Sequence, residues 1–183
     1  MRSFTLLSLV VIAASISVSA PTSRPTPPLV FKNARGGPDL ALSQFKGKIV
    51  ALALTSTTCE HCQMLTHLLN KVQDDYQKKN VVVVECAFND NVQMTLGPFM
   101  KDVAPKFAMG YTSNDAILKF LNWNEKKDGI LYVPYMLFID AKGVIRFEEK
   151  GRDGFFVNAD QSVRKVLDQM TGGAPAAPAA KKK

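Results

Sequence analysis

This 183-residue chain contains few cysteines and histidines. It also lacks a patch that interleaves basic with aromatic side chains. Three cysteines are too few for a framework of structural disulfides, and their number is odd. Two histidines leave no second Cys/His pair at ligand spacing, whereas zinc needs about four ligands. Without a basic, aromatic patch a nucleic-acid partner is excluded, although the net charge is +7. We therefore expect no metal, no other cofactor and no nucleic acid.

The bulk composition is that of a folded protein. Hydrophobic residues make up 46% of the chain and charged residues 21%, a balance typical of globular domains rather than of disordered chains. Once a leader and a tail are set aside, about 145 residues remain, which is the size of one ordinary domain. A domain of this size buries a core without disulfide staples. We expect a monomer.

The first 20 residues have the pattern of a secretory signal peptide. Arg2 precedes an apolar stretch at residues 4–18, which is followed by small residues up to Ala20. At about 15 residues, the apolar stretch is short for a bilayer span. Pro21 directly after Ala20 is a poor neighbour for cleavage, so an uncleaved N-terminal anchor is the alternative. Export predicts a periplasmic or other extracytoplasmic location, where disulfides persist.

Composition divides the remainder into three parts. Residues 21–28 contain four prolines and predict an extended tether. Residues 29–171 carry the periodic patterns of one folded domain. Residues 172–183 begin with a glycine pair and continue with alanine, proline and lysine, so we expect a disordered tail.

Within the domain, turn residues and hydrophobic periodicity predict an alternation of strands and helices. In chain order we expect a hairpin over 29–42, a strand at 49–54, a helix starting at Cys59, a strand at 81–88, a short helix opened by Pro98, a helix over 116–121 capped by Ser113, strands at 135–140 and 144–149, and a last helix capped by Asn158. This order predicts an α/β fold in three layers, α/β/α, with a central mixed sheet and an N-terminal β-hairpin.

The chemistry is concentrated in Cys59-Glu60-His61-Cys62, between the strand at 49–54 and the next helix. A Cys-x-x-Cys at such a junction is typical of a thiol–disulfide active site, with a Cys59–Cys62 disulfide in the oxidised form. Cys62 belongs to an apolar helical stripe and Cys59 does not, which predicts an exposed nucleophile and a shielded resolving thiol. The stripe consists of Cys62, Leu65, Leu69, Val72 and Tyr76.

Neighbouring groups are expected to tune the nucleophile. A helix N-terminus lowers the pKa of a thiol at Cys59, protonated His61 lowers it further, and Glu60 opposes both. An inert structural disulfide, or half of a zinc site, is the alternative for the pair. Cys86 lies late in the buried strand at 81–88 and is interpreted as a small hydrophobic residue, with a remote resolving thiol as the alternative.

The order of elements, with Cys59–Cys62 at the first strand-to-helix junction, resembles the thioredoxin fold. The hairpin and the Leu-Ser-Gln-Phe-Lys-Gly-Lys stretch at 42–48 resemble the TlpA/ResA-type branch of exported thioredoxin-like proteins, in the redoxin group. The resemblance implies an exported thiol–disulfide oxidoreductase that exchanges the pair with cysteines of protein substrates and of a redox partner. It also implies that Pro134 is cis and faces the dithiol, and that the backbone of Val133 binds the substrate.

Some features of those relatives are missing. Ala53 stands where thioredoxin has a buried Asp, and Leu65 stands where cytochrome-maturation members have a Glu. The resemblance therefore implies a dithiol without the usual proton-handling carboxylates. His61 is typical of strongly oxidising Cys-Pro-His-Cys sites and Glu60 of reducing Cys-Glu-Pro-Cys sites, so the redox direction stays open.

Two other functions fit parts of the motif. A peroxiredoxin-like thiol peroxidase requires Pro-x-x-x-Thr/Ser-x-x-Cys; Ser56 matches the hydroxyl position, but Leu52 replaces the proline. A Cu(I)-binding thioredoxin-like chaperone would use Cys59, Cys62 and a His or Met, since soft ligands suit Cu(I). Only two residues separate the cysteines, where such a chaperone has three, and no histidine lies outside the motif helix.

Overall fold

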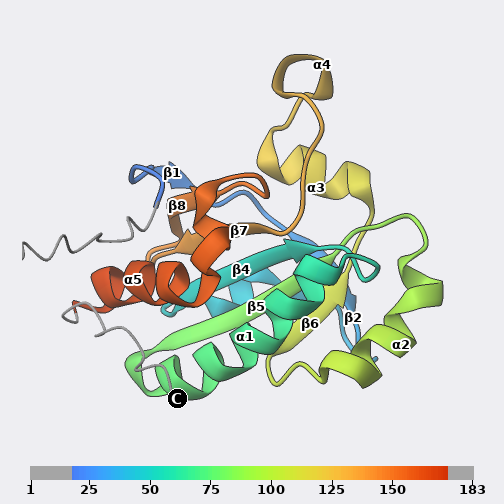
Figure 1. Cartoon of the computed structure of the whole chain (residues 1–183), viewed down its shortest axis with the longest axis horizontal. Coiled ribbons are helices and arrows are strands. Elements are labelled where there is room, and N and C mark those ends of the chain that lie inside the picture. The colour runs from blue at the N-terminus through green and yellow to red at the C-terminus, as the bar shows by residue number, and fades with distance from the viewer. Residues whose placement is uncertain (1–17, 173–183) are drawn as a thin grey trace, which may run out of the picture.

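An eight-stranded mixed sheet runs through residues 18–172, which are the part of the chain that the computed structural model describes (Figure 1). The strand order is β1-β8-β7-β4-β5-β6-β2-β3. The strands are β1 Arg24–Pro25, β2 Val30–Asn33, β3 Leu40–Ala41, β4 Ile49–Thr55, β5 Val81–Ala87, β6 Ala108–Tyr111, β7 Tyr135–Ile139 and β8 Val144–Glu149.

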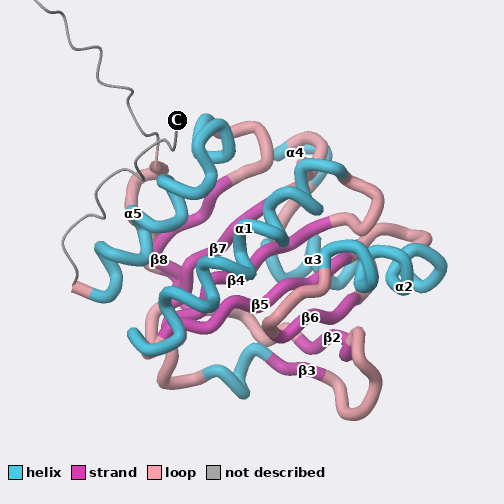
Figure 2. Tube along the Cα trace, turned by 60° about the horizontal axis from the view of Figure 1, so that its bottom comes forward, coloured by secondary structure: helices cyan, strands magenta, loops and turns pink. Residues whose placement is uncertain are grey.

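Helices cover both faces of this sheet. In Figure 2, α1 and α5 lie across one face, where α2 packs beside α1. Apolar side chains of α3 and of the 3₁₀ helix η1 pack on the other face. The helices are η1 Leu42–Phe45, α1 Glu60–Tyr76, η2 Gln77–Lys79, α2 Val92–Val103, α3 Asn114–Leu121, α4 Glu125–Asp128, η3 Gly154–Asn158 and α5 Ala159–Thr171. The predicted three-layer α/β/α arrangement is therefore confirmed.

The central strand β4 fixes the position of the cysteines. It pairs in parallel with β5 and antiparallel with β7, and the side chains from Ala51 to Leu54 are fully buried. Such burial on both faces explains why this strand is a continuous apolar run rather than an alternating one. The β4–α1–β5 crossover places the start of α1 at the carboxyl end of β4. The predicted stripe of α1, from Cys62 to Tyr76, is buried against the sheet.

The predicted hairpin is present as β2 and β3, joined through Gly36 and Gly37 at φ values of 79° and 84°. It extends the sheet by pairing antiparallel with β6, a strand that the sequence patterns do not predict. The pairing is close, because a Cβ atom on Gly110 of β6 would overlap the carbonyl oxygen of Lys32 and the ring of Phe31. Only glycine fits at this crossing of β2 and β6.

The proline-rich segment 21–28 is extended, as predicted, but it is not a free tether. Arg24–Pro25 forms the edge strand β1 against β8, and the carboxylate of Glu148 binds Arg24 at 2.6 Å. Prolines are tolerated here because an edge strand needs hydrogen bonds on one side only. Just before it, Ser19 donates to Glu149 from its backbone and its hydroxyl, at 2.9 and 2.8 Å.

One predicted helix start is wrong. Pro98 does not open a short helix but lies inside α2, where it is exposed. Asn158 is the N-cap residue of α5, as predicted, although its side chain makes no capping hydrogen bond. Ser113 caps α3 as predicted, accepting from the backbone N–H of Ala116.

The leader and tail predictions fall mostly beyond what the structure describes. Residues 1–17 of the predicted signal peptide and residues 173–183 of the predicted tail lie outside the described range. Within residues 18–172, no helix combines the length and the apolar character needed to cross a membrane.

Candidate functional site

The two cysteines of the motif lie where β4 ends and α1 begins. Cys59 is the N-cap residue of α1, and its backbone N–H donates to the carbonyl of Ser56 at 3.2 Å. The Cys59 sulfur accepts a hydrogen bond from the backbone N–H of Cys62 at 3.2 Å, so the thiol takes the place of the side-chain oxygen that usually caps a helix. The positive end of the helix dipole is thus directed at the Cys59 sulfur.

The loop before Cys59 is fixed by hydrogen bonds to the region after β5. Buried Thr57 donates its backbone N–H to the side-chain oxygen of Asn89 at 3.0 Å, and its hydroxyl lies 2.6 Å from that of Thr95 in α2. The side chain of Gln63 donates to the carbonyl of Thr57 at 3.2 Å. These contacts hold the turn that presents Cys59.

The two thiols differ in exposure as the stripe predicts. Cys62 is 0% exposed, Cys59 is partly exposed, and both are free thiols in this structure. Attack by an outside sulfur is therefore open to Cys59 alone, while Cys62 is screened from solvent beneath it.

The environment also separates the acidities of the two thiols. The Cys62 thiol donates a hydrogen bond to the Cys59 sulfur, which outweighs burial and lowers the pKa of Cys59 from 9.0 to about 6. The backbone N–H groups of Cys62 and His61 and the charge of His61 act in the same direction. The same hydrogen bond, followed by burial and the negative charges of Cys59 and Glu85, raises the pKa of Cys62 far above 9.0. At a pH between the two pKa values, Cys59 is therefore ionised while Cys62 keeps its proton.

A groove beside the dithiol contains three more of the predicted residues. His61 from α1 lines it together with Val133 and Pro134, whose peptide bond is cis. The groove has a volume of about 560 Å³, and its apolar walls include Met64 and Val157, which are 58% and 80% exposed. Glu60 is exposed on the first turn of α1 but does not line the groove.

Charged groups lie at the border of the groove. Arg152 stacks on the ring of Tyr132 at 3.6 Å, and Asp153 and Asp160 line the same hollow. Asp160 is held by Arg164 at 2.8 Å. The groove therefore combines an apolar floor with both signs of charge.

The structure contains a buried carboxylate near the dithiol that the comparison of single positions did not identify. Glu85 in β5 is fully buried and accepts hydrogen bonds from the hydroxyls of Thr55 and Thr66, and its charge acts on Cys62. The sequence held a signal for it, since Glu85 is the single charged residue in the predicted strand at 81–88. A charge in a doubly buried strand requires a partner or a function.

Cys86 lies on the other side of the sheet from the dithiol. It is fully buried among the apolar side chains of the α3 face, with Leu54 as its register partner on β4, and burial raises the pKa of its thiol. With β5 itself between it and α1, Cys86 cannot meet Cys59 without unfolding. The structure agrees with a core residue and not with a remote resolving thiol.

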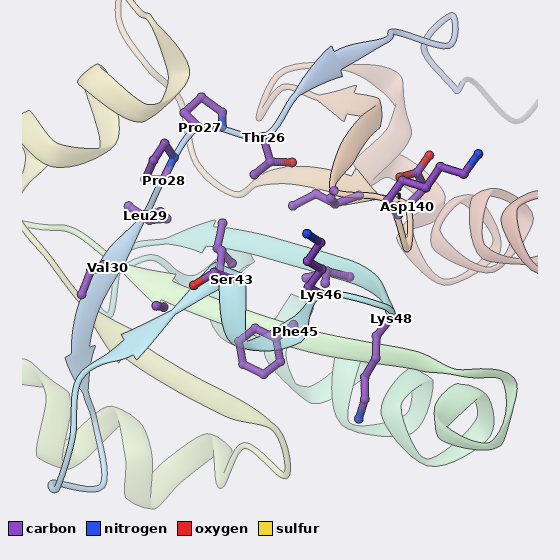
Figure 3. A pocket seen from close by; sticks show the side chains of 16 residues that line it. Thr26, Pro27, Pro28, Leu29, Val30, Ser43, Phe45, Lys46, Lys48 and Asp140 are labelled. Atoms are coloured by element: carbon purple, nitrogen blue, oxygen red, sulfur yellow. Dashed lines mark hydrogen bonds between the residues drawn. The ribbon is translucent and has the colours of Figure 1, made fainter.

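The remaining features do not add to the dithiol site. Within residues 18–172 no three His, Cys, Asp or Glu side chains are grouped so that they could hold a metal ion. A second cavity lies between Pro27 and Pro28 on one side and Ser43 and Phe45 on the other (Figure 3). It adjoins Val50, near the amino end of β4, and so lies at the far end of this strand from the cysteines.

Comparison with known proteins agrees with this geometry. Residues 23–148 match the model of the AhpC/TSA family. The thiol-disulfide oxidoreductase ResA of Bacillus thuringiensis is 26% identical over 115 residues, which are 63% of this chain and 62% of ResA. The chain thus aligns with about three fifths of the length of the curated relatives it matches.

Solved structures show the same fold. A thiol:disulfide interchange protein from Bacteroides sp. superposes with a TM-score of 0.63 at 17% identity, covering 85% of this chain and 93% of that protein. A thiol:disulfide interchange protein of the thioredoxin family from Chlorobium tepidum gives 0.63 at 20% identity, covering 85% of this chain and all of the other. The predicted thioredoxin fold is confirmed.

Proposed function

The chain belongs to the AhpC/TSA family, and from this we propose that it is an exported thiol–disulfide oxidoreductase acting on cysteines of other proteins. One observation carries the proposal: a partly exposed thiol with a lowered pKa caps α1 directly beside a buried thiol with a raised pKa. The ResA resemblance supports the same activity.

The exchange proceeds in two steps. The Cys59 thiolate attacks one sulfur of a substrate disulfide, which forms a mixed disulfide and releases the other substrate sulfur as a thiolate. Cys62 then loses its proton and attacks the Cys59 sulfur, which forms the Cys59–Cys62 disulfide and releases the second substrate thiolate. The same steps in reverse oxidise a dithiol substrate, and a separate redox partner restores the starting state.

The groove at Val133 and Pro134 is the proposed substrate site. Its apolar walls suit an extended segment with an apolar side chain next to its cysteine, and the backbone of Val133, just before cis Pro134, would pair with that segment. His61 at the groove border would lie beside the reacting sulfurs. Export is supported by the signal-peptide pattern of residues 1–20.

The test compares the two single serine variants. In Cys62→Ser the second step is blocked, so mixed disulfides with a peptide disulfide should accumulate and be visible by mass spectrometry. In Cys59→Ser no exchange and no adduct should occur, because the buried Cys62 cannot be reached. Failure of Cys62→Ser to form any adduct with an accessible peptide disulfide would contradict the proposal.

The two alternative functions have direct readouts. For a thiol peroxidase, Leu52, which is fully buried within β4, takes the place of the proline that the peroxide pocket requires. Peroxide consumption faster than by an ordinary thiol would favour it nonetheless. Stoichiometric Cu(I) retained against a chelator, without disulfide exchange, would favour a copper chaperone.

A further inference from the structure

Glu85 is a fully buried carboxylate on the α1 face of the sheet, and its charge acts on Cys62. It pairs in register with Ala53 of β4, the position at which the sequence lacks an acid. Side chains of register partners on parallel strands share one face, so the small methyl group of Ala53 leaves room beside Glu85. The carboxylate reaches the region under α1 from one strand further along the sheet.

Two hydroxyls hold the carboxylate. Thr55 donates to it at 2.9 Å, and the Thr66 hydroxyl lies 3.0 and 3.1 Å from its two oxygens. The Thr66 hydroxyl also lies 2.9 Å from the carbonyl oxygen of Cys62. A hydroxyl has one hydrogen to donate, so Thr66 serves either the ionised carboxylate or the Cys62 carbonyl. A protonated Glu85 would donate to the Thr66 oxygen, and the Thr66 hydroxyl could then donate its hydrogen to the carbonyl oxygen of Cys62.

No cation balances this carboxylate within residues 18–172. The flanking strand positions are uncharged, Ala53 on β4 and Met109 on β6, and among the described residues Glu85 forms no ion pair. Helix α1 presents the titratable thiols of Cys59 and Cys62. On β5 itself Cys86 points to the opposite face.

Burial without a cation raises the pKa of Glu85 from 4.5 to about 7, against the two threonine hydrogen bonds that lower it. The charge of Glu85 also raises the pKa of Cys62, and the interaction is reciprocal. A negative charge on either group therefore favours a proton on the other.

Once Cys59 enters a mixed disulfide, its sulfur is no longer a thiolate and no longer accepts the hydrogen of Cys62. The buried thiol must then lose its proton to another group before it can attack. We propose that Glu85, positioned by Thr55 and Thr66, accepts the proton of Cys62 in the resolving step and returns it in the reverse reaction. The inference rests on the proposed dithiol exchange.

The step balances as follows. The proton of the Cys62 thiol passes to the Glu85 carboxylate, the Cys62 sulfur bonds to the Cys59 sulfur, and the bond from Cys59 to the substrate sulfur breaks. The substrate leaves as a thiolate with the electron pair of that bond. Thr66 links Glu85 to the carbonyl oxygen of Cys62 and not to its sulfur, so the role of Glu85 is to hold the proton rather than to touch the reacting sulfurs.

The resolving step can be observed by itself with dithiobis(nitrobenzoate). Attack by Cys59 releases one coloured nitrothiobenzoate and leaves the second in a mixed disulfide, which Cys62 then displaces in a slower phase that does not depend on reagent concentration. In the wild-type protein the slow phase should speed up with pH and bend near pH 7, as Glu85 becomes the ionised acceptor.

Glu85→Gln cannot accept a proton but preserves size and hydrogen bonding. Its slow phase should be at least about tenfold slower at pH 7, within the range of general-base effects. The rate of this phase should increase with pH without a bend near pH 7. The first phase should stay unchanged. The matched control Glu125→Gln removes an exposed carboxylate of α4, outside the motif, and should keep both the rate and the bend.

Thr55→Val decides the matter if the glutamine variant does not fold. It removes one hydrogen bond that stabilises the ionised form, so the bend should move to higher pH. A slow phase with the wild-type pH profile in Glu85→Gln, or an unmoved bend in Thr55→Val, would overturn the role of Glu85. Absence of the first phase in the wild-type protein would instead overturn the dithiol exchange itself.

Discussion

Replacing Glu85 by glutamine should remove a defined pH dependence from the stability of the fold. Burial raises the pKa of Glu85 from 4.5 to about 7. At about 1.4 kcal/mol for each pKa unit, the ionised carboxylate costs the folded state about 3 kcal/mol relative to the unfolded chain. The side chain is fully buried, so solvent screening does not reduce this figure.

The sign follows from which state binds the proton. Between pH 4.5 and about 7 the folded protein keeps the proton of Glu85, while the unfolded chain has released it. Unfolding therefore releases a proton in this window, and the contribution of Glu85 to stability falls as the pH rises through it. Below the window Glu85 has no cost, and above it the full cost is present.

The assay is urea unfolding of the reduced protein at a series of pH values from about 4 to about 8. Glutamine stays neutral and can still accept hydrogen bonds from Thr55 and Thr66. From the lowest to the highest pH, the free energy of unfolding of Glu85→Gln should therefore rise by about 3 kcal/mol relative to that of the wild type. The comparison cancels the titration of all other groups, which the two proteins share.

A difference that stays constant with pH would refute the reasoning, because it would mean that Glu85 ionises alike in the folded and unfolded states. The slope of free energy against urea should match between the two proteins at each pH, which shows that the same surface unfolds. Glu60→Gln is the control for loss of one exposed carboxylate, and its curve should follow that of the wild type.

Two further predictions test the site and the sheet. The rate of alkylation of Cys59 by iodoacetamide should rise with pH with a midpoint near pH 6. Cys62→Ala should raise this midpoint more than His61→Gln does, because the hydrogen bond from Cys62 is the largest cause of the lowered pKa of Cys59. A larger effect of His61→Gln would contradict this assignment. In urea unfolding, Gly110→Ala should lower the free energy of unfolding by about 1–3 kcal/mol or more, because the new methyl group overlaps the Lys32 backbone. Unchanged stability would disprove the close approach of β2 and β6 at this position.

Patterns that are local in sequence predicted the dithiol well. The i, i+3, i+4 stripe on α1 depends on residues within one helix, so it was sufficient to separate buried Cys62 from partly exposed Cys59. The apolar run of β4 and the glycine pair of the β2–β3 turn are local in the same sense. Each of these features needs no knowledge of which distant segment packs against it.

Features that depend on distant partners were missed. Arg24–Pro25 becomes a strand because β8, far along the chain, offers an edge. Ala108–Tyr111 contains a glycine and is short, and it is a strand because β5 and β2 lie on either side of it. Pro98 is tolerated within α2 because that part of the helix faces solvent. In each case tertiary contacts outweigh local propensity.

The buried acid illustrates the same limit at the site itself. The comparison of single positions showed Ala53 where an acid was expected. Judged from that one position, the dithiol would have no acid near it. The parallel register of β4 and β5 is what puts Ala53 and Glu85 side by side, and it becomes known only with the sheet. Ala53 and Glu85 are register partners on the same face of the sheet, so a small side chain on β4 lies beside a long acidic one on β5. A search of single sequence positions cannot recognise such a pair, because the register is a property of the folded sheet.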